Sequence, residues 1–249
     1  MEITGINNNL VKEVTKLQQK KYRDKTGYFL LEGFKSVFEA HNSGIILEHV
    51  FVLKDRADKY KFLNRELILT TEAVLKKIST TDSAPEVVAV GHQLKSDFEK
   101  LKTSKKVVLL ENISDAGNLG TIIRSAAAFN IESIILYGDT VDLYNPKCVR
   151  SAVGNMWKVN IVSIKEFNLL KKYFNDFERV ATLPKTDNSV WLKDWTPRGK
   201  FLVMFGSEAD GLTNELKNYA TTNLTIEMNK EVESLNLSTS ASIVMYEMG

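Results

Sequence analysis

The chain has 249 residues, 43% of them hydrophobic, which is enough for one or two domains with apolar cores. Its formal net charge is only +2, so overall charge does not mark a nucleic-acid-binding protein, and any basic surface must be local. The single cysteine, Cys148, excludes an internal disulfide framework. The sequence shows no signal peptide and no apolar run near the ~20 residues that span a bilayer, so we expect a cytoplasmic protein without membrane contact.

The N-terminal part predicts a small α/β unit. Leu10, Val14 and Leu17 have the spacing of one apolar helix face. Short apolar runs predict strands at residues 28–32, 49–53, 67–69 and 87–90, with a second helix at 34–41.

The first predicted helix also has a basic side, formed by Lys12, Lys16, Lys20 and Arg23 at helical spacing. Such a stripe is suited to RNA phosphates, but it also fits an ordinary solvated lysine face. The pattern alone leaves both interpretations open.

A boundary is expected at the lysine-rich stretch 93–106, which separates two patterned regions. Its composition fits a helix or an extended linker equally well. We therefore predict an N-terminal domain over 1–92, a linker over 93–106 and a C-terminal domain over 107–249.

The C-terminal part alternates strand and helix, which predicts a parallel-sheet α/β domain. Strands are expected at 107–110, 133–137, 159–164, 179–183, 201–205 and 224–227. Helices are expected to begin at Leu119, Asn145, Phe167, Asn214 and Ser238. In open sheets of this kind, ligands bind beyond the carboxyl ends of the strands.

Polar residues and glycines follow the first of these strands, over 111–120. We expect Asn118 to be the N-cap of the next helix, which carries Arg124 on a face with the small residues Thr121 and Ala128. Spacing alone favours a solvated arginine. However, similar clusters at 206–212 and 233–238 follow two later strands, and parallel strand ends gather at one edge, so the three clusters are expected to converge.

The three clusters resemble the three sequence motifs of the SpoU/TrmH family of the SPOUT class. These proteins are RNA ribose 2′-O-methyltransferases that use S-adenosylmethionine. The motifs occur in order and are formed by Asn118 and Arg124, by Gly206, Ser207, Glu208, Gly211 and Leu212, and by Ser234, Leu235, Asn236 and Ser238.

The resemblance implies a set of site residues. The catalytic group would be Arg124, Asn118, Glu208, Ser234 and Asn236, and the adenosyl pocket would be lined by Thr182, Leu183, Gly206, Ile226, Met228, Leu235 and Asn236. The family often treats the motif arginine as a base. Because a free guanidinium has a pKa above about 12, we favour a role in holding the phosphate and stabilising developing oxyanion charge.

The residues around Tyr22–Arg23 and at 29–33 resemble the substrate-binding domain of many SpoU/TrmH proteins, whose fold is similar to small RNA-binding ribosomal proteins. With this resemblance, Arg23 and Lys35 are expected to contact RNA. Residues 145–157 also resemble a family segment, which implies RNA contacts for Arg150 and Ser151.

The resemblance further implies a deep trefoil knot in the C-terminal domain and a homodimer formed through that domain. Ribosomal RNA is the expected substrate, because many two-domain relatives act on it, and transfer RNA remains an alternative. His41, His49 and His92 show no metal-ligand spacing with carboxylates or Cys148, so no metal is expected.

Three other functions were weighed. A catalytically idle RNA-binding protein of the same fold is disfavoured by the complete set of catalytic residues. A base methyltransferase on a related fold is disfavoured by Arg124 together with 234–236. A nucleotide-binding dehydrogenase is disfavoured because the sequence lacks a G-x-G-x-x-G motif.

Overall fold

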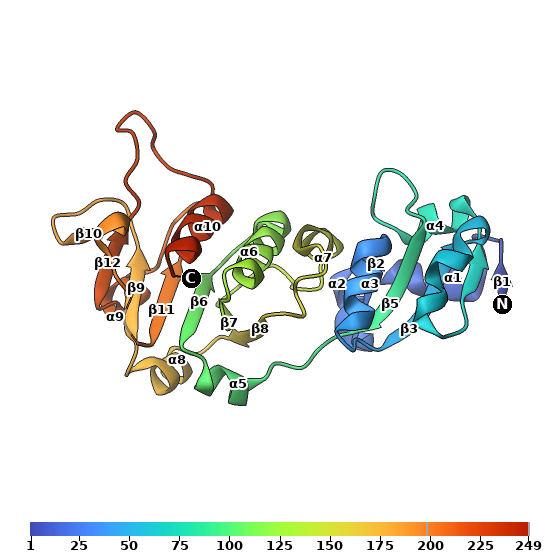
Figure 1. The fold of residues 1–249 in the computed structure, drawn as a ribbon, viewed down its shortest axis with the longest axis horizontal. Helices are drawn as coiled ribbons and strands as arrows, with labels where there is room; N and C mark the ends of the chain where they lie inside the picture. The colour runs from blue at the N-terminus through green and yellow to red at the C-terminus, as the bar shows by residue number, and fades with distance from the viewer. Residues whose placement is uncertain (198, 249) are drawn as a thin grey trace. The chain divides into compact units, whose positions relative to one another are not determined.

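The computed structural model describes residues 1–197 and 199–248, so Gly249, the last residue of the predicted C-terminal domain, lies outside the described residues. The chain forms two compact units (Figure 1). The first unit contains Met1–Lys95 and Asp142–Trp157, and the second contains Ser96–Val141 and the chain from Lys158 onward. The segment 142–157, which we predicted within 107–249, therefore packs in the first unit. The exact predicted domain boundaries stay a prediction.

The first unit is built on a mixed sheet with the strand order β1-β4-β3-β5-β2. Its strands are β1 (Glu2–Ile3), β2 (Tyr28–Glu32), β3 (Leu47–Leu53), β4 (Ile68–Thr70) and β5 (Val87–His92), and β5 runs antiparallel to both β2 and β3. Its helices are α1 (Asn9–Lys16), α2 (Lys20–Thr26), α3 (Phe34–Asn42), the 3-10 helix η1 (Lys54–Leu63), α4 (Glu72–Ile78) and α7 (Pro146–Ala152). α1 and α4 share a core cluster with the strands, as the predicted apolar stripe requires.

The predicted first helix is in fact two helices, which corrects the predicted basic stripe. α1 ends at Lys16, and Gln19 adopts an extended backbone before α2 begins at Lys20. Lys12 and Lys16 therefore lie on one helix, and Arg23 lies on another.

Arg23 is only 2% exposed and is anchored by an ion pair within the first unit. Its Nε donates to the Asp142 carboxylate at 2.8 Å, a second guanidinium nitrogen donates to the same oxygen, and Nη1 donates to the Leu17 carbonyl at 2.8 Å. The ring of Phe29 lies 4.9 Å from that of Tyr144. These contacts hold the segment 142–157 in the first unit.

The second unit contains a seven-stranded sheet in which every strand pair is parallel, as predicted. The strand order is β10-β12-β9-β11-β6-β7-β8. The strands are β6 (Lys106–Glu111), β7 (Ser133–Tyr137), β8 (Asn160–Ile164), β9 (Glu178–Thr182), β10 (Ser189–Trp191), β11 (Phe201–Phe205) and β12 (Thr222–Thr225). The 3-10 helix η2 (Leu192–Asp194) follows β10.

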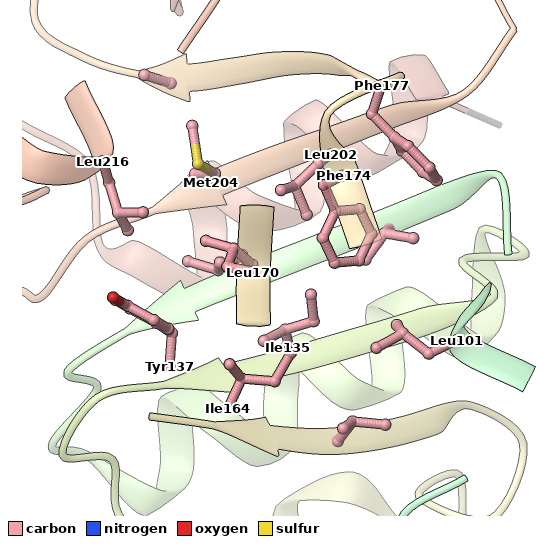
Figure 2. Packing of buried hydrophobic residues seen from close by; sticks show 14 of the residues in the cluster. Leu101, Ile135, Tyr137, Ile164, Leu170, Phe174, Phe177, Leu202, Met204 and Leu216 are labelled. Atoms are coloured by element: carbon pink, nitrogen blue, oxygen red, sulfur yellow. The ribbon is translucent and has the colours of Figure 1, made fainter. Parts of the chain in front are cut away.

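Helices cover both faces of this sheet. α5 (Phe98–Thr103), α8 (Phe167–Phe174) and α9 (Asn214–Tyr219) pack on one face, where Leu101, Leu170 and Leu216 meet the alternate residues of the strands (Figure 2). α6 (Ala116–Ala128) and α10 (Leu237–Met248) pack against each other. Since α6 buries Ile122 and Ile123 outside that cluster, it covers the opposite face.

The strand order places a switch point between β6 and β11. From β6 the chain continues to β7 and β8 on one side, whereas β9, β11 and β12 lie on the other side. The registers Leu110↔Phe205 and Leu224↔Thr182 align the carboxyl ends of four neighbouring strands. Ligands of open α/β sheets bind at such points, so the fold places the candidate site at this edge.

One buried carboxylate joins the two central strand ends. Glu111, the last residue of β6, is 2% exposed and accepts hydrogen bonds from the backbone N–H and the hydroxyl of Thr213, each at 2.7 Å. Thr213 is the N-cap of α9. The carboxylate therefore fixes the loop that leads from β11 to α9.

No helix in the described part of the chain is long and apolar enough to cross a membrane.

Replacing Glu111 should test this clamp. Glu111→Ala removes a buried carboxylate and both of its hydrogen bonds to Thr213, and we expect a loss of about 2 kcal/mol in the free energy of unfolding, measured by urea denaturation. Glu99→Ala is the matched control, because the Glu99 side chain is 82% exposed and its pairing with Lys102 contributes little. Equal stability of the two variants would contradict the clamp.

Candidate active site

The first motif is organised by Asp115 rather than by Asn118, so the predicted N-cap is wrong. α6 begins at Ala116, and the Asp115 carboxylate accepts the backbone N–H of Asn118 at 2.8 Å. Asp is as good a cap as Asn, and its charge also interacts favourably with the helix dipole. The side chain of Asn118 is consequently released from capping.

Asn118 instead joins all three motif segments. Its Nδ2 donates to Glu208 Oε1 at 2.9 Å, and its Oδ1 accepts from Asn236 Nδ2 at 3.1 Å. The hydroxyl of Ser114 lies 3.4 Å from the other oxygen of Glu208. The structure thus brings together three of the five predicted catalytic residues.

Asn236 also accepts hydrogen bonds at the start of α10. Its Oδ1 accepts from the backbone N–H of Ser238 at 2.9 Å and from the Ser238 hydroxyl at 2.6 Å. Further along the same helix, the hydroxyls of Ser242 and Ser125 lie 2.7 Å apart and tie α10 to α6. The third motif is therefore held against the helix that carries Arg124.

Arg124 and Ser234 are not part of the hydrogen-bonded group. Both side chains are exposed, and over residues 1–197 and 199–248 neither forms a hydrogen bond or an ion pair. Arg124 follows Asn118 by six residues, which is about 9 Å along an α-helix. Its guanidinium is thus available to an incoming anion.

The second motif is a tight turn that only glycine permits. A Cβ on Gly206 would lie 1.9 Å from the carbonyl carbon of Gly211 and 2.1 Å from the nitrogen of Leu212. Ser207 and Gly211 exchange two backbone hydrogen bonds, and Gly211 has a φ of +67°. The chain therefore folds back directly onto Gly206 at the end of β11.

The other predicted pocket residues lie at or beyond neighbouring strand ends. Thr182 ends β9 and donates its hydroxyl to the Met204 carbonyl at 2.9 Å, and the backbone N–H of Leu183 bonds to Leu224. Ile226 and Met228 lie beyond β12, which ends at Thr225, two residues earlier than predicted. The half-buried residues of this set are Thr182, Leu183, Ile226 and Leu235, whereas Met228 is 37% exposed.

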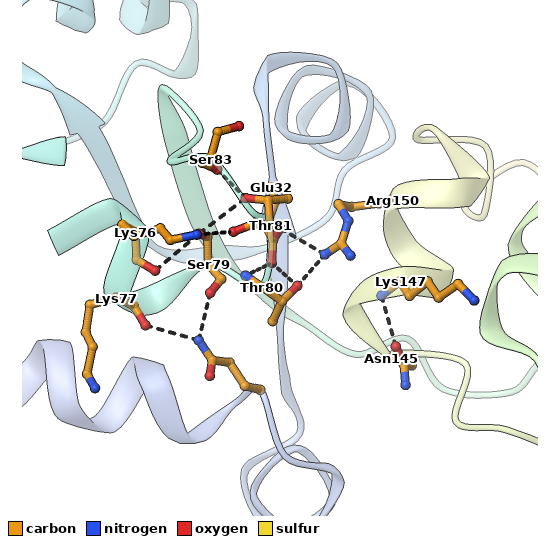
Figure 3. Close-up of polar contacts among 11 residues, drawn as sticks. Glu32, Lys76, Lys77, Ser79, Thr80, Thr81, Ser83, Asn145, Lys147 and Arg150 are labelled. Carbon is orange, nitrogen blue, oxygen red and sulfur yellow. Dashed lines mark hydrogen bonds and ion pairs between the residues drawn. The ribbon is translucent and has the colours of Figure 1, made fainter. Parts of the chain in front are cut away.

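Two of the predicted RNA contacts are engaged inside the first unit. Arg23 is buried against Asp142, which argues against its predicted RNA contact. The carboxylate partner lies 119 residues away, so it leaves no mark in the local sequence. Arg150 Nη1 pairs with Glu32 Oε2 at 3.0 Å and donates to the hydroxyl of Thr80 (Figure 3).

Lys35 and Ser151, the other two predicted RNA contacts, are not held in ion pairs like those of Arg23 and Arg150. Lys35 is exposed on α3, and Ser151 is half-buried on α7. Their predicted RNA contacts remain predictions.

Sequence analysis missed the residues that position the site. Asp115 caps α6, Glu111 anchors Thr213, and Ser125 meets Ser242. Asp115 was detectable, since an Asp three residues before Asn118 is an N-cap candidate. The other pairs join residues far apart in the chain.

A separate hollow of about 220 Å³ is lined by Lys102, Lys172, Tyr173, Asp176, Phe177 and Lys200. Phe177 and Lys200 directly precede β9 and β11, so it lies at the opposite ends of the strands from the motifs. It is therefore not the candidate site. Within the described ranges, no three His, Cys, Asp or Glu side chains lie close enough to hold a metal ion.

Comparisons with known proteins identify both parts of the chain. Residues 105–246 match the SpoU rRNA Methylase family, and residues 8–89 match the MRM3-like substrate binding domain. The chain is 29% identical to the 23S rRNA (guanosine(2553)-2′-O)-methyltransferase RlmP of Bacillus subtilis over 99% of this chain and 98% of that protein.

Other relatives agree with this assignment. An uncharacterized tRNA/rRNA methyltransferase of Synechocystis is 30% identical over 98% of this chain and 92% of its own length. The crystal structure of an AdoMet-bound rRNA methyltransferase from Sinorhizobium meliloti superposes with a TM-score of 0.86, at 28% identity over 99% of this chain and 96% of that one. The predicted resemblance is confirmed: this chain is a member of the SpoU rRNA methylase family, with a substrate-binding domain before its methyltransferase domain.

Proposed function

We propose that this enzyme transfers the methyl group of S-adenosylmethionine to a ribose 2′-hydroxyl of ribosomal RNA. The observation that carries the proposal is the Asn118 side chain, which links Glu208 and Asn236 at the switch point of the sheet. The names of the relatives support it, since RlmP is a 23S rRNA 2′-O-methyltransferase and the Sinorhizobium meliloti protein binds AdoMet. We propose a cytoplasmic location, a reducing setting that suits a chain whose single cysteine, Cys148, is buried and forms no disulfide.

The residues present fit this cofactor. At Gly206 the backbone of Gly211 and Leu212 comes close to the end of β11, and the apolar side chains of Ile226 and Leu235 are half-buried. Thr182, Leu183, Gly206, Ile226, Met228, Leu235 and Asn236 would hold it. When bound, S-adenosylmethionine supplies an electrophilic methyl carbon, and the protein's task is to align the ribose oxygen with it.

Arg124 is assigned to the RNA side of the reaction. It is exposed on α6 and has no protein partner among the described residues, so its guanidinium is free to hold a phosphate beside the target ribose. The same cation stabilises negative charge that develops on the 2′-oxygen. Glu208 and Asn236, which share Asn118, position the loops on either side, and Ser234 lies beside Leu235 as a further ribose contact.

Two finer features belong to the proposal. The C-terminal segment is proposed to form a trefoil knot, as in the SPOUT class. Ribosomal RNA is preferred to transfer RNA because relatives that match over nearly the whole chain are named as 23S rRNA 2′-O-methyltransferases.

The proposal is tested by mapping ribose methylation in rRNA from a strain that lacks the gene. One 2′-O-methyl group should disappear, and purified enzyme with S-adenosylmethionine should restore it, as measured by mass spectrometry of nuclease digests.

Arg124→Ala should lower turnover by about a hundredfold or more while cofactor affinity changes little. Lys217→Ala, exposed on α9, is the control. Restoration of the mark on tRNA, or unchanged turnover of Arg124→Ala, would contradict the assignment.

Gly206→Ala should damage the cofactor pocket specifically. The added methyl group must displace the Gly211–Leu212 backbone, and we expect S-adenosylmethionine to bind roughly tenfold weaker or worse, since each 1.4 kcal/mol of strain is a factor of ten. Isothermal titration measures the affinity. Gly5→Ala is the control, because no atom lies within 4 Å of its added Cβ. Equal affinities of the two variants would remove Gly206 from the pocket.

A homodimer formed through the second unit is also proposed. α10 exposes Ile243 (37%) and Tyr246 (67%), and the Tyr246 ring lies 5.7 Å from Phe129 next to α6. An exposed apolar patch of this kind is typical of an interface. Sedimentation should show a dimer for the wild type and a monomer for Ile243→Glu/Tyr246→Glu, whereas a wild-type monomer at high concentration would count against the proposal.

A further inference from the structure

The α1–α2 surface of the first unit is strongly basic although the chain as a whole is nearly neutral. Its exposed lysines are Lys12, Lys16, Lys20, Lys21 and Lys25, and its exposed acids are Glu13 and Asp24. Arg23, in the middle of this sequence, does not contribute, because Asp142 neutralises it in the interior. The local excess of positive charge therefore comes from lysines at the surface.

An aromatic ring lies within this basic surface. Tyr22 is half-buried, and Lys21 Nζ at 4.9 Å and Lys16 Nζ at 5.8 Å from the centroid lie over its ring, so a base that stacks there replaces an ammonium group on the ring face. Asp24 pairs with Lys20, whose Nζ lies 2.7 Å from the carboxylate, and neither Lys16 nor Lys21 forms an ion pair among the described residues.

The backbone around Tyr22 is held in place. Its N–H bonds to the Gln19 carbonyl at 3.1 Å, and its carbonyl accepts the Thr26 hydroxyl at 2.8 Å. The next residue, Arg23, is fixed by its ion pair with Asp142. The backbone that carries the ring is therefore already ordered, so no backbone entropy is lost there when a ligand stacks on the ring.

We propose that Tyr22, Lys16 and Lys21 form a stacking site for an unpaired base in a single-stranded segment of the RNA substrate. Proteins bind single strands by combining a basic surface with aromatic rings on which bases stack, because every base has a π face. A duplex keeps its bases inside and offers no free face to the ring. The inference rests on the proposed function, and it assigns substrate contact to Tyr22 and the lysines in place of Arg23.

Binding of two probes to the full-length protein tests the site. The probes are a fluorescein-labelled single strand of twelve uridines and an RNA duplex of twelve base pairs, followed by fluorescence anisotropy. Wild type should prefer the single strand. Tyr22→Leu, which keeps an apolar side chain, should bind the single strand about tenfold weaker and the duplex unchanged, whereas Tyr22→Phe should bind both like wild type.

The lysines make a separate and quantitative test. Each phosphate contact to single-stranded RNA contributes about 0.7 to the slope of log affinity against log salt, so Lys16→Gln/Lys21→Gln should reduce the slope by about 1.4. The matched control is Lys54→Gln/Lys61→Gln, which removes two exposed lysines from η1 in the same unit and should leave the slope unchanged. Equal slopes in both double variants would overturn the proposal.

Other outcomes separate this site from the proposed function. The stacking site would be overturned if Tyr22→Leu kept its affinity for the single strand, or if wild type bound duplex and single strand equally. It would also be overturned if a peptide of twelve glutamates displaced the labelled single strand as well as unlabelled single strand does. If wild type transfers no methyl group to rRNA but binds the probes as expected, the proposed function fails and the stacking site stands. If wild type methylates rRNA but Tyr22→Leu binds the single strand like wild type, the proposed function stands and the stacking site fails.

Discussion

The active site depends on how two parallel strands end. β6 and β11 are neighbours at the point where the strand order reverses, and the Glu111 carboxylate at the end of β6 holds Thr213 in the loop after β11. Hydrogen bonds to a charged group contribute more than neutral ones. Because this carboxylate joins the chain segments of the first and second motifs, it fixes their separation before any ligand binds, and the candidate site is organised by the protein itself.

Asn118 then connects the three motifs because an amide both donates and accepts. Its nitrogen faces the Glu208 carboxylate, and its oxygen faces the Asn236 amide. An aspartate at this position would repel Glu208, and an alanine would remove the link between Glu208 and Asn236. Arg124, by contrast, is left without a protein partner among the described residues. The polar contacts therefore position the loops, and the guanidinium that we propose as the substrate contact is not used by them.

The sequence predicted the strands well and the tertiary pairing poorly. Apolar runs such as 107–110 and 201–205 lie in buried parallel strands because no other element accommodates them. The break between α1 and α2 was missed because Leu17 continues the apolar stripe and no Gly or Pro marks the end. β1 and β10 are too short to give a pattern. The Arg23–Asp142 pair joins residues 119 positions apart, so only the fold reveals it.

The chemistry of arginine and lysine explains which basic residues are paired inside the first unit and which are exposed. Arg23 and Arg150 are paired with Asp142 and Glu32 inside the first unit, whereas the lysines of α1 and α2 stay exposed. A guanidinium is planar, weakly hydrated and matched to a carboxylate, so it tolerates burial, while an ammonium is strongly hydrated and remains at the surface.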